Sequence, residues 1–74
     1  MTSDILILLK TPVDDRVAED VKAAIYGVTK SAIVNFNSEP GKVFLVRFDP
    51  DQDHASAILS AVREGGWEAT MAGG

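Results

Sequence analysis

The sequence of 74 residues contains no cysteine. Without thiols the chain cannot form a disulfide bond, hold zinc or copper(I) through thiolates, or use a cysteine nucleophile. Its one histidine cannot build an imidazole cluster. We therefore expect no cofactor and no catalytic centre of these kinds.

Long apolar runs and basic residues are also scarce. The longest apolar run, residues 5–9, is far shorter than a membrane span or a signal-peptide core, so we expect no membrane partner and a cytoplasmic location. Eleven acidic against seven basic residues give a net charge of −4, which argues against nucleic-acid binding. An apolar content of 46% is typical of one small globular domain, here residues 1–74.

Hydrophobic spacing divides the chain into six elements. Short apolar runs predict strands, and apolar residues three or four positions apart predict helices. The predicted strands cover residues 4–10, 29–36, 42–48 and 67–71, with a turn at 37–41 and a frayed tail at 72–74. The first helix is expected to end at Gly27, and the second to follow the acidic run 49–53 and end at Gly65 and Gly66.

The start of the first helix is marked by capping residues. Thr11 is the expected N-cap, Pro12 suits the first helical position, and Asp14 can complete a capping box. Gly27 stands where a helix end favours a left-handed residue. The apolar face of this helix is predicted to consist of Val13, Val17, Val21, Ala24 and Val28.

Three acids, Asp49, Asp51 and Asp53, precede the second helix. Their spacing is similar to the start of an EF-hand loop, but His54 stands where that loop needs glycine, and Ser60 replaces its bidentate glutamate. We therefore expect the acids to cap the helix. Its apolar face is predicted to consist of Ile58, Ala61, Val62 and Gly65.

The two halves of the chain echo each other at an offset of 38 residues, which aligns Pro12 with Pro50 and Gly27 with Gly65. Each half reads as strand, helix and strand. Two such units predict an α+β, ferredoxin-like βαββαβ fold, with both helices on one face of a four-stranded antiparallel sheet.

Alternation along the strands leaves a second apolar set on the other face of this sheet. A one-layer sheet needs only one apolar face, so the second set indicates an interface for a protein partner or a homodimer. Partial exposure of good strand formers is the other interpretation, and both stay open. The set consists of Leu6, Leu8, Ile33, Val43 and Leu45.

Few residues are candidates for chemistry. Asp14, Asp15 and Glu39 share one end of the predicted fold and are weak candidates for a hard cation, although helix capping also explains Asp14. His54 has only carboxylates near it as possible co-ligands. No base and nucleophile stand in a recognisable catalytic motif, so we expect no enzyme.

A series of short segments follows in a characteristic order: Gly27-Val28, strands through Phe36 and Phe48, and Asp49-Pro50. The second helix then ends in Ala61-Val62-Arg63-Glu64-Gly65-Gly66-Trp67-Glu68-Ala69. This order resembles the heavy-metal-associated domain of copper chaperones, mercury-binding proteins and metal-pumping ATPases, in which the last segment commonly reads Ala-Ile-x-x-Ala-Gly-Tyr-x-Ala. The resemblance implies the ferredoxin-like fold.

The resemblance also implies a departure. Family members bind soft metal ions through Met-x-Cys-x-x-Cys, and counting back from Gly27 places its cysteines at about Thr11 and Asp14 and its methionine at Leu9. Thiolates select such ions, and a hydroxyl and a carboxylate do not. We therefore expect an interaction module without the thiolate site. The alternatives are a metal handler that uses carboxylates of the first loop and a regulatory domain that binds a small molecule near Gly65 and Gly66.

Overall fold

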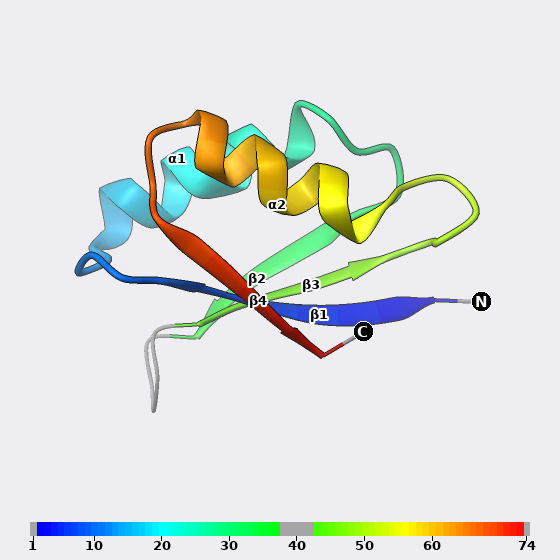
Figure 1. Ribbon diagram of the computed structural model, residues 1–74, viewed down its shortest axis with the longest axis horizontal. Coiled ribbons are helices and arrows are strands. Elements are labelled where there is room, and N and C mark those ends of the chain that lie inside the picture. The colour runs from blue at the N-terminus through cyan, green and yellow to red at the C-terminus, as the bar shows by residue number, and fades with distance from the viewer. Residues whose placement is uncertain (1, 38–42, 74) are drawn as a thin grey trace.

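The computed structural model describes residues 2–37 and 43–73. The described residues confirm the predicted order of strands and helices (Figure 1). The elements are β1 (Ser3–Leu9), α1 (Asp15–Tyr26), β2 (Ile33–Asn37), β3 (Val43–Phe48), α2 (Ala55–Glu64) and β4 (Ala69–Gly73). The predicted turn at 37–41 falls largely on residues 38–42, outside the described part.

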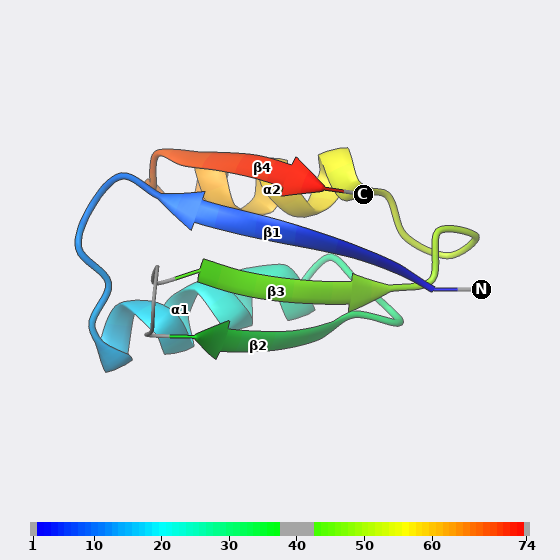
Figure 2. The same ribbon diagram turned by 90° about the horizontal axis from the view of Figure 1, so that it is seen from below.

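The four strands form one antiparallel sheet in the order β2-β3-β1-β4. Both helices cover the same face of this sheet, as the ferredoxin-like topology requires (Figure 1). Seen from below, β2 and β4 are the outer strands (Figure 2). The loop after β1 and the connection from α2 to β4 lie at one end of the molecule, and the connection from β3 to α2 lies at the other (Figure 2).

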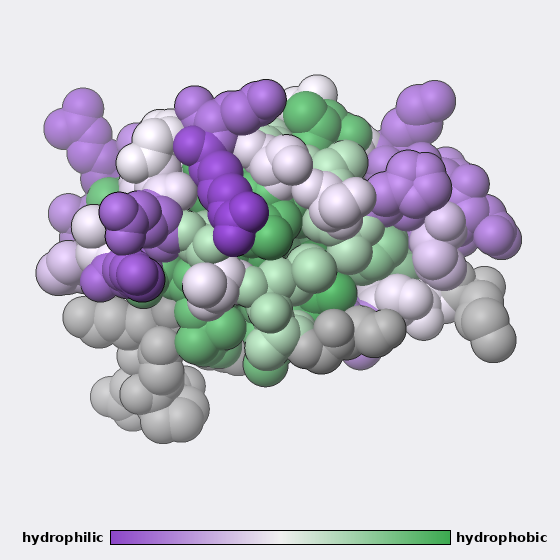
Figure 3. All heavy atoms as spheres, viewed as in Figure 1, coloured by the Kyte–Doolittle hydropathy of each residue, from purple (hydrophilic) through white to green (hydrophobic). Residues whose placement is uncertain are grey.

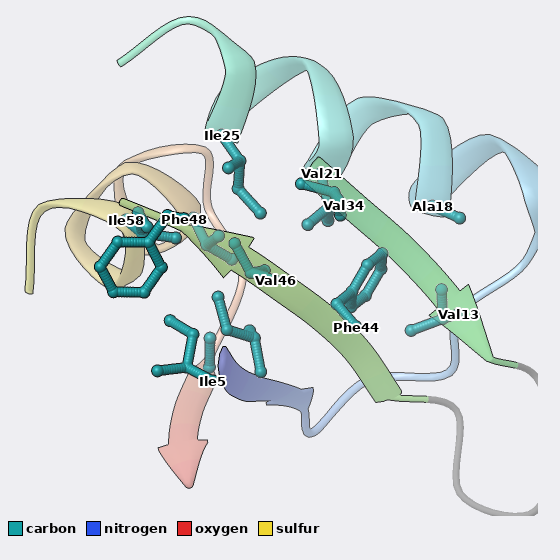
Figure 4. Close-up of a cluster of buried hydrophobic side chains, with 13 residues drawn as sticks. Ile5, Val13, Ala18, Val21, Ile25, Val34, Phe44, Val46, Phe48 and Ile58 are labelled. Carbon is teal, nitrogen blue, oxygen red and sulfur yellow. The ribbon is translucent and has the colours of Figure 1, made fainter. Parts of the chain in front are cut away.

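The core lies between the sheet and the helices (Figure 4). In β1, Ile5 and Ile7 are buried while Leu6 and Leu8 are exposed, because successive side chains of a strand point to opposite faces. The same alternation buries Phe44 and Val46 in β3. Phe36 from β2 packs against Phe44, with ring centroids 4.9 Å apart. The predicted inward faces of the strands are therefore confirmed.

The first helix begins later than the sequence predicted. Its N-cap is Asp14, not Thr11: the backbone of Asp14 is extended, and its Oδ1 accepts the N–H of Val17 at 2.8 Å. Pro12 accordingly lies ahead of the helix. Val13, just before the cap, is buried together with Ala18, which is the arrangement of a hydrophobic staple (Figure 4). The carboxylate and the staple together fix the start of α1 at Asp15.

The buried face of α1 also differs from the predicted one. The buried residues are Ala18, Val21 and Ile25, whereas the prediction centred the face on valines and included Val28. Val28 lies beyond the helix end and is exposed. Gly27 closes the helix in right-handed conformation, with φ −69°, so the expected left-handed residue at this position is wrong. The hydrogen bonds from the Gly27 N–H to carbonyls of the last turn end α1 without a left-handed turn.

The second helix buries Ile58, Ala61 and Val62 as predicted, but its start and end differ from the prediction. Its N-cap is His54, whose side chain makes no capping hydrogen bond, and its first turn carries no acid. The expectation that the acidic run caps this helix is therefore wrong. Gly65 ends the helix while exposed, outside the buried face, and Gly66 adopts the positive φ of 99° that turns the chain toward β4.

The last strand lies two residues later than predicted. β4 covers Ala69–Gly73, and Ala72 pairs with Leu6 while Gly73 pairs with Ile5. Residues 72 and 73 therefore belong to the sheet and are not a frayed tail, because β1 offers them ladder partners. Trp67, expected in the strand, instead precedes it and packs against the core. No helix within residues 2–37 and 43–73 combines the length and the apolar character that a bilayer crossing requires.

Candidate functional site

The face of the sheet away from the helices, which we call the open face, carries several apolar side chains. The strand register places Leu6 beside Leu45 of β3 and Ala72 of β4, and Leu8 beside Val43 of β3. Residues directly opposite one another in antiparallel strands share a face. The apolar residues of the open face are Leu6, Leu8, Ile33, Val43, Leu45 and Ala72, and the register also places Asn35 beside Leu45 and Thr70 beside Leu8.

The predicted residues of the open face thus lie together on the uncovered side. Ile33 is 58% exposed, and Leu6 and Leu8 are 37% and 38% exposed. Val43 and Leu45 are half-buried between neighbouring strands. In Figure 3, hydrophobic residues gather over the middle and lower part of the molecule, and hydrophilic residues lie at its two ends and over the upper middle. Ala72 was not predicted on this face, because the sequence pattern placed it in a frayed tail.

An ion pair lies on the open face, in one cross-strand row with Ile33. The Nε of Arg47 lies 2.9 Å from Oδ1 of Asp4, and the register pairs these two residues across β3 and β1. The hydrogen bond from Arg47 lowers the pKa of Asp4 below its usual value, and the same bond raises the pKa of Arg47. The charges cancel, so the described residues of this face carry no net charge. Asp4 lies two positions from Leu6 and Arg47 two positions from Leu45, so the sequence already places both charges on the face of these leucines.

The first loop holds the positions that the resemblance assigns to metal ligands. Thr11 is exposed, and Asp14 uses Oδ1 to accept the N–H of Val17 as a helix cap. Asp15 is exposed in the first turn of α1, and Glu39 lies outside the described residues. Within residues 2–37 and 43–73, no three histidine or acidic side chains come together as a metal site would require. A hydroxyl and a capping carboxylate do not fit a soft metal ion.

At the opposite end, Asp53 holds two loops together, a role that the sequence pattern did not predict. The residue is only 6% exposed, and its carboxylate accepts the backbone N–H of Lys30 and of Ser31, at distances between 2.9 and 3.2 Å. The Ser31 hydroxyl also donates to Asp53 and accepts the N–H of Asp49 at 2.8 Å. This arrangement, the Asp53–Ser31 latch, explains why β2 begins at Ile33 and not at Thr29.

The pKa values at this end follow from the hydrogen bonds. The Ser31 hydroxyl, with the backbone N–H groups of Ser31 and Lys30, lowers the pKa of Asp53. The backbone N–H of Asp51 and the side chain of Gln52 likewise lower the pKa of Asp49. Each carboxylate therefore serves as a structural acceptor in its charged form. The acids stabilise the loop before α2 and link it to β2.

A shallow hollow of about 380 Å³ lies beside the start of β4. Two cations and one carboxylate border it: Lys10 lies 3.8 Å from Glu68, and the guanidinium of Arg63 donates to the carbonyl of Ala69 at 3.1 and 3.2 Å. Trp67 forms part of the wall. Gly65 and Gly66 lead into this region along the chain, but they do not line the hollow.

The residues weighed for catalysis are exposed side chains at the start of α2 and along it. His54 is exposed at the start of α2, and Ser56 and Ser60 are exposed on the same helix. Within residues 2–37 and 43–73, the imidazole of His54 makes no capping hydrogen bond and no ion pair with an acid. Within the described part of the chain, these residues therefore do not form a pair of a general base and a nucleophile.

Comparison with known proteins finds solved structures that share this fold. No protein-family model matches the sequence, and no curated protein matches it significantly. Oxidized MerP from Ralstonia metallidurans CH34 superposes with a TM-score of 0.80, at 18% identity over 96% of this chain and 97% of that chain. The fold is heavy-metal-associated-like.

Two further solved structures share this heavy-metal-associated-like fold. A copper-binding domain from HMA7, a P-type ATPase, superposes with a TM-score of 0.78, at 18% identity over 95% of this chain and 93% of that chain. The mercury-bound form of MerP, the periplasmic protein of the bacterial mercury detoxification system, gives a TM-score of 0.73 at 17% identity, over 96% of this chain and 97% of that chain. What the chain shares with these proteins is the βαββαβ architecture.

Proposed function

We propose that this chain is a non-catalytic interaction domain that works without a thiolate metal site and pairs with a second copy through the open face. The observation that carries the proposal is the exposure of Leu6, Leu8 and Ile33 on a sheet whose other face already contains the whole described core. Leucine is not β-branched, so strand propensity alone does not account for two leucines on this face. An interface accounts for them.

The energetics favour covering this face. Burying each of the three exposed side chains would contribute about 1 kcal/mol, given that they are already partly covered. A second copy would contribute the same three side chains again. Association costs several kilocalories per mole in lost freedom of motion, so we expect weak pairing, with a Kd in the micromolar to millimolar range.

Electrostatics favour a second copy at this face over contact elsewhere. The chain carries a net charge of −4, so two copies repel each other over most of their surface. On the open face, Asp4 and Arg47 neutralise each other. Two open faces therefore meet without like-charge repulsion. Arg47 of each copy can also pair with Asp4 of the other copy, so no charge is left unpaired.

Metal binding is the function that the fold alone would suggest, because the structural neighbours include a copper-binding domain and a mercury-bound protein. The residues of the first loop argue against carrying it over to this chain. Thr11 and Asp14 offer oxygen donors, and the Asp14 oxygen already caps α1. Soft ions prefer thiolates, so the interaction role remains the better supported function.

Sedimentation equilibrium tests the proposal by measuring mass against concentration. The wild-type chain should shift from monomer toward dimer as its concentration rises. A Leu6→Thr/Leu8→Thr variant should remain a monomer while keeping its far-ultraviolet circular dichroism spectrum, because both side chains lie outside the core.

Val28→Thr is the matched control, since Val28 is an exposed apolar residue that lies between α1 and β2 and off the open face. This control should associate like the wild type. A wild-type chain that stays monomeric at millimolar concentration would overturn the proposal. So would a leucine variant that associates as strongly as the wild type.

A further inference from the structure

The two outer strands of the sheet differ in how their free edges are covered. On β2, the backbone N–H of Val34 points away from β3 and donates to the hydroxyl of Tyr26 at 3.0 Å. This contact brings the last residue of α1 over the β2 edge. An edge whose outward donor is taken in this way is protected from pairing with another chain.

The outward groups of β4 follow from its register with β1. The N–H of Lys10 donates to the carbonyl of Glu68 at 3.0 Å, so Glu68 and the residues two and four positions on, Thr70 and Ala72, direct their backbone groups to β1. Ala69 and Met71 therefore direct theirs outward. The Arg63 guanidinium takes the carbonyl of Ala69. No hydrogen bond from the described residues reaches the outward N–H and C=O of Met71.

The side chains of β4 give this edge little protection. The strand reads Ala-Thr-Met-Ala-Gly and contains no charge and no proline. Met71 is 39% exposed at the edge. Lysine, proline or a bulge usually guards an edge strand, so β4 is the edge of this sheet at which another extended chain can add.

The hollow beside β4 specifies the chemistry of such a chain. Ala69 and Thr70 of β4 line it, so a strand added along β4 would lie beside it. Lys10 and Arg63 outnumber Glu68 there, which makes this region locally positive in a chain of net charge −4. Trp67 adds an apolar wall. We propose that β4 accepts an extended peptide segment of a partner protein, with an acidic side chain of that segment seated between Lys10 and Arg63.

A pair of synthetic peptides tests this site. The probe is acetyl-Thr-Val-Thr-Glu-Thr-Val-Thr-amide, and the control peptide carries Lys in place of Glu. Trp67 is the only tryptophan, so its fluorescence reports on the hollow directly. We expect the acidic peptide to bind with a Kd on the order of 10⁻⁴ M, the lysine peptide to bind at least about fivefold more weakly, and amide exchange at Met71 to slow on binding.

Two variants separate the edge from the hollow. Met71→Pro removes the outward N–H but no hydrogen bond to β1, and should weaken the acidic peptide about fivefold to tenfold, whereas Met71→Leu should bind normally. Arg63→Gln should reduce the preference for the acidic over the lysine peptide. A peptide with N-methylated valines should fail to bind the wild type, which gives the same test without relying on the proline variant to fold.

Three results would overturn the inference. The first is that the acidic peptide at several millimolar changes neither Trp67 fluorescence nor amide exchange at Met71. The second is that this peptide binds Met71→Pro as tightly as it binds the wild type. The third is that Met71→Pro no longer self-associates while Leu6→Thr/Leu8→Thr still does, which would identify a second copy as the occupant of the β4 edge. The leucine variant should bind the acidic peptide normally, so failure of the open-face proposal is distinguishable from failure of this one.

Discussion

The indole of Trp67 lies directly against Gly65. A β-carbon at position 65 would come within 2.8 Å of Cε3 of the indole and closer still to Cζ3. Trp67 in turn packs against the core and borders the hollow beside β4. The missing side chain at Gly65 therefore determines where the end of α2 meets the start of β4.

Gly65→Ala should destabilise the fold through this contact. The new methyl group must displace the indole, and such overpacking typically costs about 1–3 kcal/mol. We expect a lower midpoint of chemical denaturation and a shifted Trp67 emission maximum. Gly27→Ala is the matched control, because a β-carbon there meets only helix carbonyl oxygens at 3.4 and 3.5 Å and the backbone is right-handed. That substitution should be neutral or stabilising by up to about 1 kcal/mol, and equal losses in both variants would contradict the argument.

Adjacent residues of β1 should differ sharply in their contribution to stability. Ile7 is fully buried, whereas Leu8 is 38% exposed on the open face. Ile7→Ala should lower the free energy of unfolding by about 2–5 kcal/mol, and Leu8→Ala by less than about 1 kcal/mol. Urea denaturation of the monomer at low concentration measures both. Similar losses would mean that the open face is part of the stabilising core and would remove the basis for the proposed interface.

The sequence is sufficient to predict the sheet, because side chains alternate with a period of two and one wrong register would expose the whole core. Ile5, Ile7, Phe44 and Val46 all lie inward as predicted. The outward position of Leu6 follows from the same rule. The main residues of the open face are therefore predictable from the sequence.

Helix boundaries and loop contacts are harder to predict, because several nearby residues suit the same role and contacts distant in the sequence select among them. Thr11 and Asp14 both suit an N-cap, and the buried contact of Val13 with the core selects Asp14. Asp53 looks like a helix cap from its place in the chain. It instead binds the backbone of Lys30 and Ser31, more than 20 positions away, and no spacing rule along the chain anticipates that pairing.

The Asp53–Ser31 latch makes stability depend on pH. Hydrogen bonds in the folded state lower the pKa of Asp53, so the unfolded chain binds its proton more readily. This contribution to stability is present above the unfolded pKa of about 3.9 and is lost as pH falls through the lower folded pKa. The melting temperature of the wild type should therefore decline below about pH 4.

Asp53→Asn should lower the melting temperature by several degrees at neutral pH and flatten this decline. An amide offers one acceptor oxygen, and its NH₂ group would face the N–H donors of Lys30 and Ser31. The decline should not vanish, because Asp4 and Asp49 also have lowered pKa values. Asp51→Asn is the control, since Asp51 is exposed and contributes only its backbone N–H to Asp49. A flattened pH profile in the control but not in Asp53→Asn would contradict the assignment.

Introducing thiols should create a soft-metal site if the first loop has the geometry that the resemblance to the heavy-metal-associated domain implies. A Thr11→Cys/Asp14→Cys variant should bind one silver(I) or copper(I) ion, measured by thiolate absorbance and competition with a chelator, whereas the wild type should bind neither tightly. Loss of the Asp14 cap costs about 1 kcal/mol, which the bound ion should offset by favouring the folded state. A Thr11→Ser/Asp14→Ser variant keeps a capping hydroxyl and supplies no thiolate, so it should not bind. Tight binding by the wild type would revive metal handling through oxygen donors, and a cysteine variant that binds no ion would show that Thr11 and Asp14 do not occupy the family's ligand positions.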